Sequence, residues 1–408
     1  METPPFKKHA SLQPLFVPND LVSEILFLLS VKNIVQLKCV SKSWKALISD
    51  PIFVQKHHKL SSQNPHLTLS WKTTEPAVMF VVPFPVQLLL KNPSITVSSN
   101  KSHHFETHCR VVGSCNGLLC LLFRSDTETS KPKNWFRVWN PATRTSSKNL
   151  GSFHYRTPRR YDNSYGLSCY KFSFGYDAST LTYKVVAFHV KRNNASWKSR
   201  VKIFNLGDNC WRNIQSFPLF PLNWLQNRRR LDSNCHLNDG VHLSGTINWL
   251  AMYKPLTHVV QFVIVSLDLS TESYKQLLPP PGFNEMPCFQ PVLRVLMDSL
   301  CLSHNPEKTE LVLWQMKEYG VQESWTQLFK ISYKNLQIQG IKDGFACLYV
   351  NSDMVIFTNK YCNQPYIYNL KDKTVKRVNV EHHVDWFNQA MGYVESLVSV
   401  PWLRVSFS

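Results

Sequence analysis

Residues 136–144 read FRVWNPATR, an apolar strand pattern that ends at an asparagine and is followed by a turn. Similar units follow along the chain: VKIFNLGDNCWRNI at 201–214, VIVSLDLSTESYKQL at 263–277, LVLWQMKEYGVQESWTQLF at 311–329 and YIYNLKDKTVKRV at 366–378. Their turn positions are separated by 65, 63, 49 and 52 residues, and they fall at Asn140, Asn205, Asp268, Lys317 and Asn369. Periods near 50 residues with about four strands each are typical of propeller blades.

A second repeated unit is a short strand, a small or polar turn and an apolar strand. It occurs as VVGSCNGLLCL at 111–121, VHLSGTINWL at 241–250, VLMDSLCL at 295–302 and IKDGFACLYV at 341–350, and Asn116-Gly117 is its strongest hairpin turn. These units predict a mainly β domain that resembles a propeller, with a blade count that the pattern leaves uncertain. The alternative is a β-sandwich or two stacked sheets, which would not repeat one two-hairpin unit so often.

The first 60 residues follow a helical period instead. Leu21, Val22, Ile25, Leu26 and Leu29 recur at steps of one, three and four residues and form one wide apolar stripe. Further short helices are expected over 31–40, after Ser41 and after Asp50-Pro51. About forty residues make a poor independent core, so the stripe must be covered either by a partner or by the large domain. The pattern alone does not decide between these two.

Residues 15–60 resemble a plant F-box. The matching motifs are Asp20-Leu21, Glu24-Ile25-Leu26, Lys38-Cys39-Val40 and Lys42-Ser43-Trp44. The chain departs from the family at Leu29-Ser30, where the family has Leu-Pro; this frees the bend between the first two helices and is expected to weaken adaptor affinity modestly. The resemblance implies binding to a Skp-type adaptor, which links the chain to a cullin and a RING subunit. The adaptor-facing residues that it implies are Pro18, Leu21, Ile25, Leu26, Val31 and Cys39.

The remainder resembles the F-box-associated domain of plant F-box proteins. Kelch and WD signatures are missing, because the chain has neither a double glycine nor a Trp-Asp pair. The motifs that carry the resemblance are Gly113–Leu118, Asn140-Pro141, Phe174–Asp177, Tyr183–Val186, Trp211-Arg212 and Gly245 with Trp249. The expected organisation is a flexible N-terminus (1–14), a three-helix adaptor-binding domain (15–60) and a β-propeller-like substrate-binding domain (61–408).

The chain is strongly basic, with 46 Lys+Arg against 27 Asp+Glu and a formal charge of +19. The basic residues gather in Arg156–Arg160, Lys191–Lys202 and Arg228–Arg230. A nucleic acid or an acidic protein could be the partner. No basic stripe with interleaved aromatics accompanies the charge, so we favour basic loops that keep the domain soluble, and a nucleic-acid partner is not expected. A basic nucleic-acid-binding or scaffold protein is the alternative function.

The sequence also indicates the compartment. The most apolar stretch, Phe80–Leu90, is short and is broken by two prolines, so it does not predict a membrane span. The N-terminus lacks the apolar region of a signal peptide. We therefore expect an intracellular protein of the cytoplasm or nucleus, whose eleven cysteines are reduced.

The residues that could carry chemistry do not form a recognisable site. A zinc site would use His103, His104, His108, Cys109, Cys115 and Cys120, but their spacing lacks the repeated ligand pairs of tetrahedral sites. No Walker loop, dinucleotide fingerprint or nucleophile elbow occurs, so no catalytic residue, metal or cofactor is expected. A propeller enzyme with a polar pocket at the central channel stays a third possibility.

The function expected from these patterns is substrate recognition in an SCF-type cullin-RING E3 ubiquitin ligase, without catalysis. The helices would bind the adaptor, and loops on one propeller face would bind an unknown protein substrate. Trp224, near Pro221 and Arg228, is the candidate anchor for that substrate, although it could equally cover a blade edge.

Overall fold

The structure is a computed structural model of the 408-residue chain. Several sequence-based expectations lie outside the residues that it describes: the N-terminus 1–14, Trp224 and the basic clusters at 156–160 and 228–230. The described residues are 18–72, 79–96, 103–105, 109–125, 133–154, 168–193, 196–221, 240–253, 262–281, 289, 291–336, 344–359, 365–381, 387–400 and 403–404.

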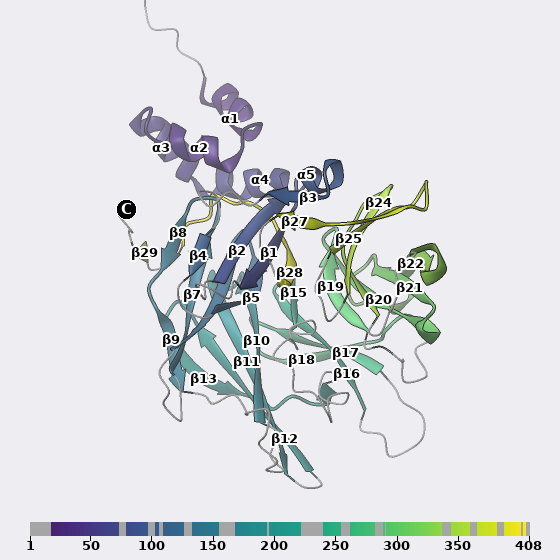
Figure 1. Cartoon of the computed structure of the whole chain (residues 1–408). Helices are drawn as coiled ribbons and strands as arrows, with labels where there is room; N and C mark the ends of the chain where they lie inside the picture. Colours follow the sequence, from purple (N-terminus) through teal and green to yellow (C-terminus); the bar gives the residue numbers. More distant parts are fainter. Residues whose placement is uncertain are drawn as a thin grey trace, which may run out of the picture.

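Four short helices form a domain at one end of the molecule (Figure 1). They are α1 (Asn19–Phe27), α2 (Val31–Leu37), α3 (Lys42–Ser49) and α4 (Pro51–Ser61). Ser41 caps α3 by accepting the Trp44 N–H, and the Asp50 carboxylate caps α4, which begins with Pro51. The helix starts predicted at Ser41 and Asp50-Pro51 are confirmed. No helix in the described part of the chain has the length and hydrophobicity that a bilayer span needs.

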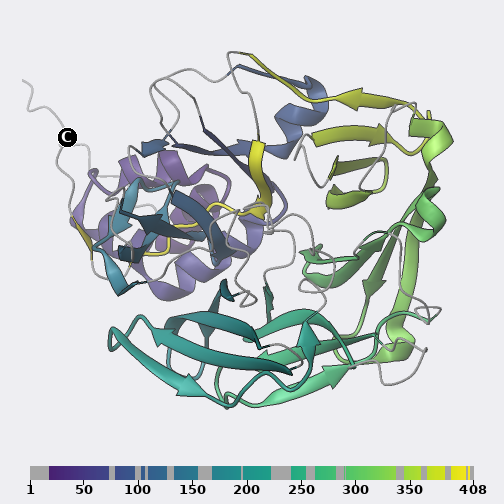
Figure 2. The same cartoon turned by 60° about the horizontal axis from the view of Figure 1, so that its bottom comes forward.

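The other elements form six antiparallel sheets around a ring, seen along its axis in Figure 2. Blade 1 contains β1 (His66–Lys72), β2 (Met79–Pro85), β4 (His103–Phe105) and β28 (Phe387–Tyr393). Blade 2 contains β5 (Cys109–Cys115), β6 (Leu118–Arg124), β7 (Lys133–Asn140), β8 (Thr145–Ser147), β9 (Leu150–His154) and β29 (Leu403–Arg404). Blade 3 contains β10 (Ser168–Asp177), β11 (Thr182–Asn193), β12 (Ser196–Asn205) and β13 (Cys210–Ile214).

The second half of the ring follows the same plan. Blade 4 contains β14 (Phe220–Pro221), β15 (Val241–Leu243), β16 (Thr246–Met252), β17 (Phe262–Asp268) and β18 (Tyr274–Leu277). Blade 5 contains β19 (Val292–Leu296), β20 (Ser299–His304), β21 (Glu310–Met316) and β22 (Trp325–Ser332). Blade 6 contains β23 (Phe345–Val350), β24 (Met354–Asn359), β25 (Pro365–Asn369) and β26 (Val375–Arg377). Short additions are α5 (Val86–Lys91), α6 (Tyr333–Leu336) and the parallel pair β3 (Ser94–Thr96) and β27 (Asn379–Glu381).

An early and a late strand of the chain, β1 and β28, pair to close the ring. The late strand β28 pairs antiparallel with β1, so that Leu67 lies opposite Gly392 and Leu69 opposite Ala390. Blade 1 therefore combines strands from the beginning and the end of the propeller. The expected propeller is confirmed with six blades, and the alternative of a β-sandwich is wrong.

The repeated turns predicted from the sequence lie at the end of the third strand of each of blades 2 to 6. In four of these blades an Asn or Asp oxygen accepts backbone N–H groups two or three residues later, an Asx turn. For example, Asn140 Oδ1 accepts from Ala142 N at 3.0 Å and from Thr143 N at 3.2 Å. The equivalent acceptors are Asn205, Asp268 and Asn369. Blade 5 has Lys317 there, and its N–H donates to the Ser324 carbonyl instead.

The predicted inner hairpins are confirmed in three blades. Asn116 and Gly117 have φ angles of 50° and 75°, the pair of positive values that a type I′ turn requires. In the unit at 341–350 the predicted apolar strand is confirmed as Phe345–Val350, whereas its short first strand and turn at 341–343 lie outside the described residues. The chain reverses after it at Asn351, whose Oδ1 accepts from Asp353 N and Met354 N.

Six hydrophobic clusters lie between neighbouring blades. Val185 packs toward blade 2 and the adjacent Val186 packs toward blade 4, because successive strand residues face opposite sides of a sheet. The strands are thus buried on both faces, which explains their nearly continuous apolar runs. The remaining interfaces are formed by equivalent clusters between blades 4 and 5, 5 and 6, 6 and 1, and 1 and 2.

Candidate functional site

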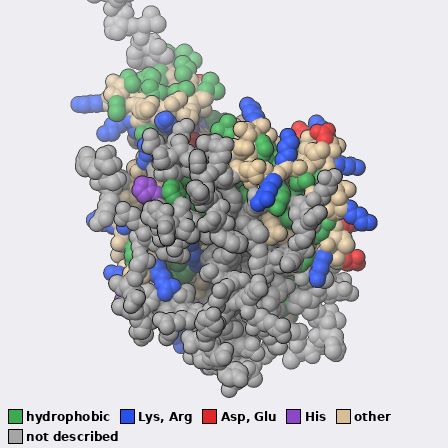
Figure 3. Space-filling view, in the orientation of Figure 1, with side chains coloured by type: hydrophobic (Ala, Val, Ile, Leu, Met, Phe, Trp, Pro, Cys, Tyr) green, Lys and Arg blue, Asp and Glu red, His purple; other side chains and the backbone are tan. Residues whose placement is uncertain are grey.

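Helix α1 carries an exposed apolar stripe. Leu21 and Ile25 of the helix and Leu28, the residue that caps its C-terminal end, are 57%, 59% and 86% exposed, and their spacing of four and three residues places them on one side. We call these three residues the α1 stripe. Val40 and Ile52 are further exposed apolar residues of the same domain. Figure 3 shows hydrophobic side chains gathered over the helices at this end of the molecule.

Of the six residues that the F-box resemblance assigned to the adaptor, two are buried and four are exposed. Leu26 and Val31 are buried at 1% exposure in the core of the helices. This differs from the prediction, because Leu26 lies four residues after Val22 on the side of α1 that faces the other helices. Adaptor contact by the exposed residues stays a prediction, and these are Pro18, Leu21, Ile25 and Cys39.

The helical core is completed by the far end of the chain. Leu397, 3% exposed, packs into the cluster formed by the helices, and Ala142 of blade 2 packs against it. The large domain thus covers part of the apolar surface of the helices, which was one of the two alternatives left open by the sequence. The α1 stripe is left uncovered.

Residues 394–400, here called the C-terminal strap, connect the helices to blade 2. The buried Asn140 side chain donates from Nδ2 to the carbonyls of Ser396 and Val398, both at 2.9 Å. Gly117 lies directly under the strap, since a Cβ built there would be 2.1 Å from the Ser396 Cβ. Two motifs of the resemblance therefore hold the strap, and the strap in turn holds the helices.

A second contact fixes α4 to the strap. His58 Nδ1 lies 3.2 Å from the Glu395 carbonyl, and the neighbouring His57 Nε2 lies 3.0 Å from the Leu29 carbonyl. Burial lowers the pKa of both imidazoles, so both are neutral at pH 7. The helical domain is consequently attached to the propeller by neutral hydrogen bonds and apolar packing.

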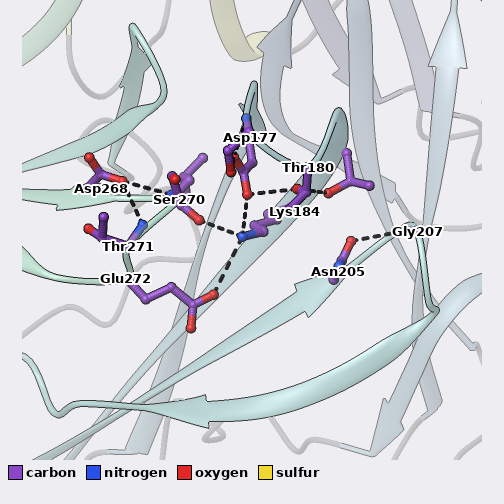
Figure 4. A network of polar contacts seen from close by, with 12 residues as sticks. Asp177, Thr180, Lys184, Asn205, Gly207, Asp268, Ser270, Thr271 and Glu272 are labelled. Carbon is purple, nitrogen blue, oxygen red and sulfur yellow. Dashed lines mark hydrogen bonds and ion pairs between the residues drawn. The ribbon is translucent and has the colours of Figure 1, made fainter.

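A buried ionic cluster joins blades 3 and 4 (Figure 4). Lys184 Nζ lies 2.7 Å from the Asp177 carboxylate, and the exposures of their side chains are 2% and 0%. The ammonium also donates to the Leu269 carbonyl and lies 3.5 Å from Glu272, which pairs with Arg212.

The ionisation of this cluster indicates a structural role. Burial alone would raise the pKa of Asp177, but hydrogen bonds from Lys184, Ser179 and Thr180 hold it well below its usual range. The carboxylate is ionised and its lone pairs are occupied by donors, so it is not poised to act as an acid or base. The motifs Phe174–Asp177 and Tyr183–Val186 meet here as the two strands of one hairpin, and blade 4 covers their ion pair.

The cysteines that suggested zinc are packed into the blades. Burial raises the pKa of Cys109 to about 12 and also raises those of Cys115 and Cys120, so the thiols are protonated. Cys115 Sγ lies 3.4 Å from Nδ1 of His242. Within the described residues no group of three or more potential ligands converges, and His108 lies outside them.

These features define a class of protein: a six-bladed propeller with a small helical domain that presents an apolar stripe. Residues 15–56 match the F-box domain, and residues 77–400 match the F-box associated beta propeller domain. Because the second match covers most of the chain, this protein belongs to the F-box associated β-propeller family. The resemblance to plant F-box proteins is confirmed.

Similar proteins include two from Arabidopsis thaliana. The F-box/kelch-repeat protein At3g23880 is 28% identical over 353 residues, which cover 84% of this chain and 85% of that protein. F-box protein CPR1 is 28% identical over 334 residues, which cover 77% of this chain and 73% of that protein. Among solved structures, TolB from Acinetobacter baumannii aligns with a TM-score of 0.38 at 9% identity, over 84% of this chain and 73% of that one.

Proposed function

We propose that this protein is the substrate-recognition subunit of an SCF-type cullin-RING ubiquitin ligase. The helical domain binds a Skp-type adaptor, which carries the cullin and the RING subunit, and the propeller holds a protein substrate. The observation that carries the proposal is the α1 stripe, three large apolar side chains left in solvent above a core that is already complete. Such a patch on a folded domain marks a protein interaction site.

The helical domain carries exposed charges of both signs. Asp20 and Glu24 of α1 lie next to Leu21 and Ile25 in the sequence, and the exposed lysines Lys32, Lys42 and Lys45 lie on α2 and α3. Protein–protein interfaces combine an apolar centre with polar surroundings. An exposed apolar stripe on a charged domain therefore fits a protein partner.

The propeller contributes binding rather than chemistry. By holding a substrate close to a ubiquitin-loaded enzyme, the receptor raises the effective concentration of the reacting groups. The proposed substrate is a protein of the cytoplasm or nucleus, and Trp224 remains its proposed anchor.

Co-purification with a Skp-type adaptor tests the adaptor contact. Leu21→Asp combined with Ile25→Asp should abolish it, because a charge in an apolar contact costs several kcal/mol, enough to remove a micromolar interaction. Both positions are exposed, so the fold should be unchanged. Leu181→Asp is the matched control, since Leu181 is 73% exposed in the β10–β11 turn of the propeller. Equal adaptor in all three samples would refute the proposal.

Proximity labelling under proteasome inhibition tests the receptor role. The comparison should use the double variant rather than a deletion of the helices, because a deletion would expose Leu397. Proteins bound to the propeller should be labelled by both forms but ubiquitinated only with the intact stripe. Identical ubiquitination with both forms would contradict a ligase function.

A further inference from the structure

A cavity of about 620 Å³ lies at the centre of the ring. The innermost strands β28, β5, β15, β19 and β23 line it, so that five of the six blades contribute. His58 and Ser62, at the end of α4, also line it, which places the helical domain against the same cavity. The volume falls within the range of small-molecule sites, roughly 300–1,000 Å³.

Arg294 of β19 lines this cavity, and no described residue forms a hydrogen bond or ion pair with it. Its Nε is buried and makes no hydrogen bond, and within the described residues no carboxylate lies within ion-pair distance of its guanidinium. Burial lowers the pKa of Arg294 to about 10, so the group is still a cation at pH 7. The nearby Cys347 cannot compensate, because burial raises the pKa of its thiol and keeps it neutral. Arg294 as a whole is partly exposed, but a polar atom that is buried without a hydrogen bond, as its Nε is, is costly to hold.

The other titratable groups of the cavity leave this charge uncompensated. Asp298 is the only Asp or Glu among the described residues that line the cavity, and it lies on the exposed hairpin turn after β19. Burial lowers the pKa values of His58, His66 and His242, so these imidazoles are neutral at pH 7. Glu395 is directed at His66, with 3.8 Å between Oε1 and Nε2.

We propose that the central cavity binds a small organic anion whose carboxylate or phosphate group pairs with Arg294. A guanidinium offers two parallel N–H donors to such a group, the geometry that makes these pairs strong. The occupant is a small molecule rather than a protein segment, because α4 and five blades of this chain already form the walls.

This site is independent of the proposed adaptor contact, since no residue of the α1 stripe lines the cavity. Its ligand touches both α4 and the blades, so it binds the assembled molecule and stabilises it against unfolding. Failure of one proposal therefore leaves the other untouched.

Thermal unfolding of the purified full chain, co-expressed with an adaptor, tests the site. Inorganic phosphate and citrate are titrated separately, with chloride added to equal ionic strength. At least one anion should raise the unfolding temperature of the native chain. Arg294→Met should lower the affinity for that anion at least tenfold, because it removes a charge-assisted pair of hydrogen bonds. Arg200→Met, at an exposed position of β12, is the matched control and should respond like the native chain.

The response pattern also identifies the ligand chemistry. A rise with phosphate alone indicates a phosphorylated ligand, and a rise with citrate alone indicates a carboxylate. An equal rise of the unfolding temperature in Arg294→Met, or no rise with either anion, would overturn the proposal. Should Arg294→Met not fold, Arg294→Lys decides, because it keeps the charge but loses the paired donors. Undiminished affinity in that variant would contradict the assignment.

Discussion

The Asp177–Lys184 pair shows how two separated motifs become one contact. Asp177 ends β10 and Lys184 lies in β11, and both face blade 4 near Leu269 and Glu272. The sequence displayed the acidic and basic residues but not their burial, because burial depends on a blade distant in sequence.

Breaking this pair should be strongly destabilising. Asp177→Asn removes the nearer counter-ion of the buried Lys184 and leaves only Glu272, at 3.5 Å, so the free energy of unfolding should fall by about 3 kcal/mol. Urea denaturation measures this loss. Asp353→Asn is the control, because Asp353 pairs with Lys371 at the exposed surface, where removal of one partner should change the midpoint little. Similar midpoint shifts in the two variants would contradict a buried, structural pair.

His242 should make the stability depend on pH. Burial lowers its pKa to about 4 in the folded chain, whereas the unfolded value is about 6.5. The unfolded state therefore takes up a proton first, and stability should fall as the pH drops from about 6.5 to about 4. In His242→Gln this part of the loss should disappear, because glutamine can accept the Tyr176 N–H without titrating. Parallel stability curves for the two proteins over that range would show that His242 does not contribute.

Among the elements, α1 was predicted best and the C-terminal strap was missed. The spacing of Leu21 and Ile25 correctly indicated an apolar face, but the width of the stripe hid that Leu26 faces inward. The strap at 394–400 has no regular period, because it is neither helix nor strand. Only its contacts with Asn140 and Gly117 show what it does.

The hairpin under the strap should tolerate only glycine. Gly117 and Gly245 have nearly equal φ angles, 75° and 77°, but a Cβ would meet Ser396 at the first and nothing within 4 Å at the second. Gly245→Ala should cost only the backbone strain, about 1–2 kcal/mol, whereas Gly117→Ala should cost clearly more. Chemical denaturation of both variants provides the comparison. Equal losses would mean that the strap does not press on the hairpin.

For the whole molecule, the repeat period predicted a propeller but not its six blades. The count was hidden because blade 1 takes β28 from residues 387–393 and its other strands from residues 66–105. The irregular steps between the early turns added to the uncertainty. A blade assembled from strands that lie far apart in the sequence leaves no periodic pattern there.

Loss of the closing strand should therefore prevent folding. A chain truncated after residue 386 lacks β28 and the strap, which leaves the edge of β1 unpaired and prone to association. Size-exclusion chromatography and thermal unfolding should show aggregation and no cooperative transition. A chain truncated after Arg404 keeps every described strand and should behave like the intact protein. A cooperative, monomeric propeller without β28 would contradict the closure.

Hydrogen exchange on the intact chain, with and without a Skp-type adaptor, tests the central claim most directly. Adaptor should slow amide exchange in α1 and around Val40, where the uncovered apolar residues lie, and leave blades 3 to 5 unchanged. The Leu21→Asp, Ile25→Asp variant should show no protection at any adaptor concentration tested. Unchanged exchange in α1 at saturating adaptor, or protection on the propeller instead, would show that the helices are not the docking surface.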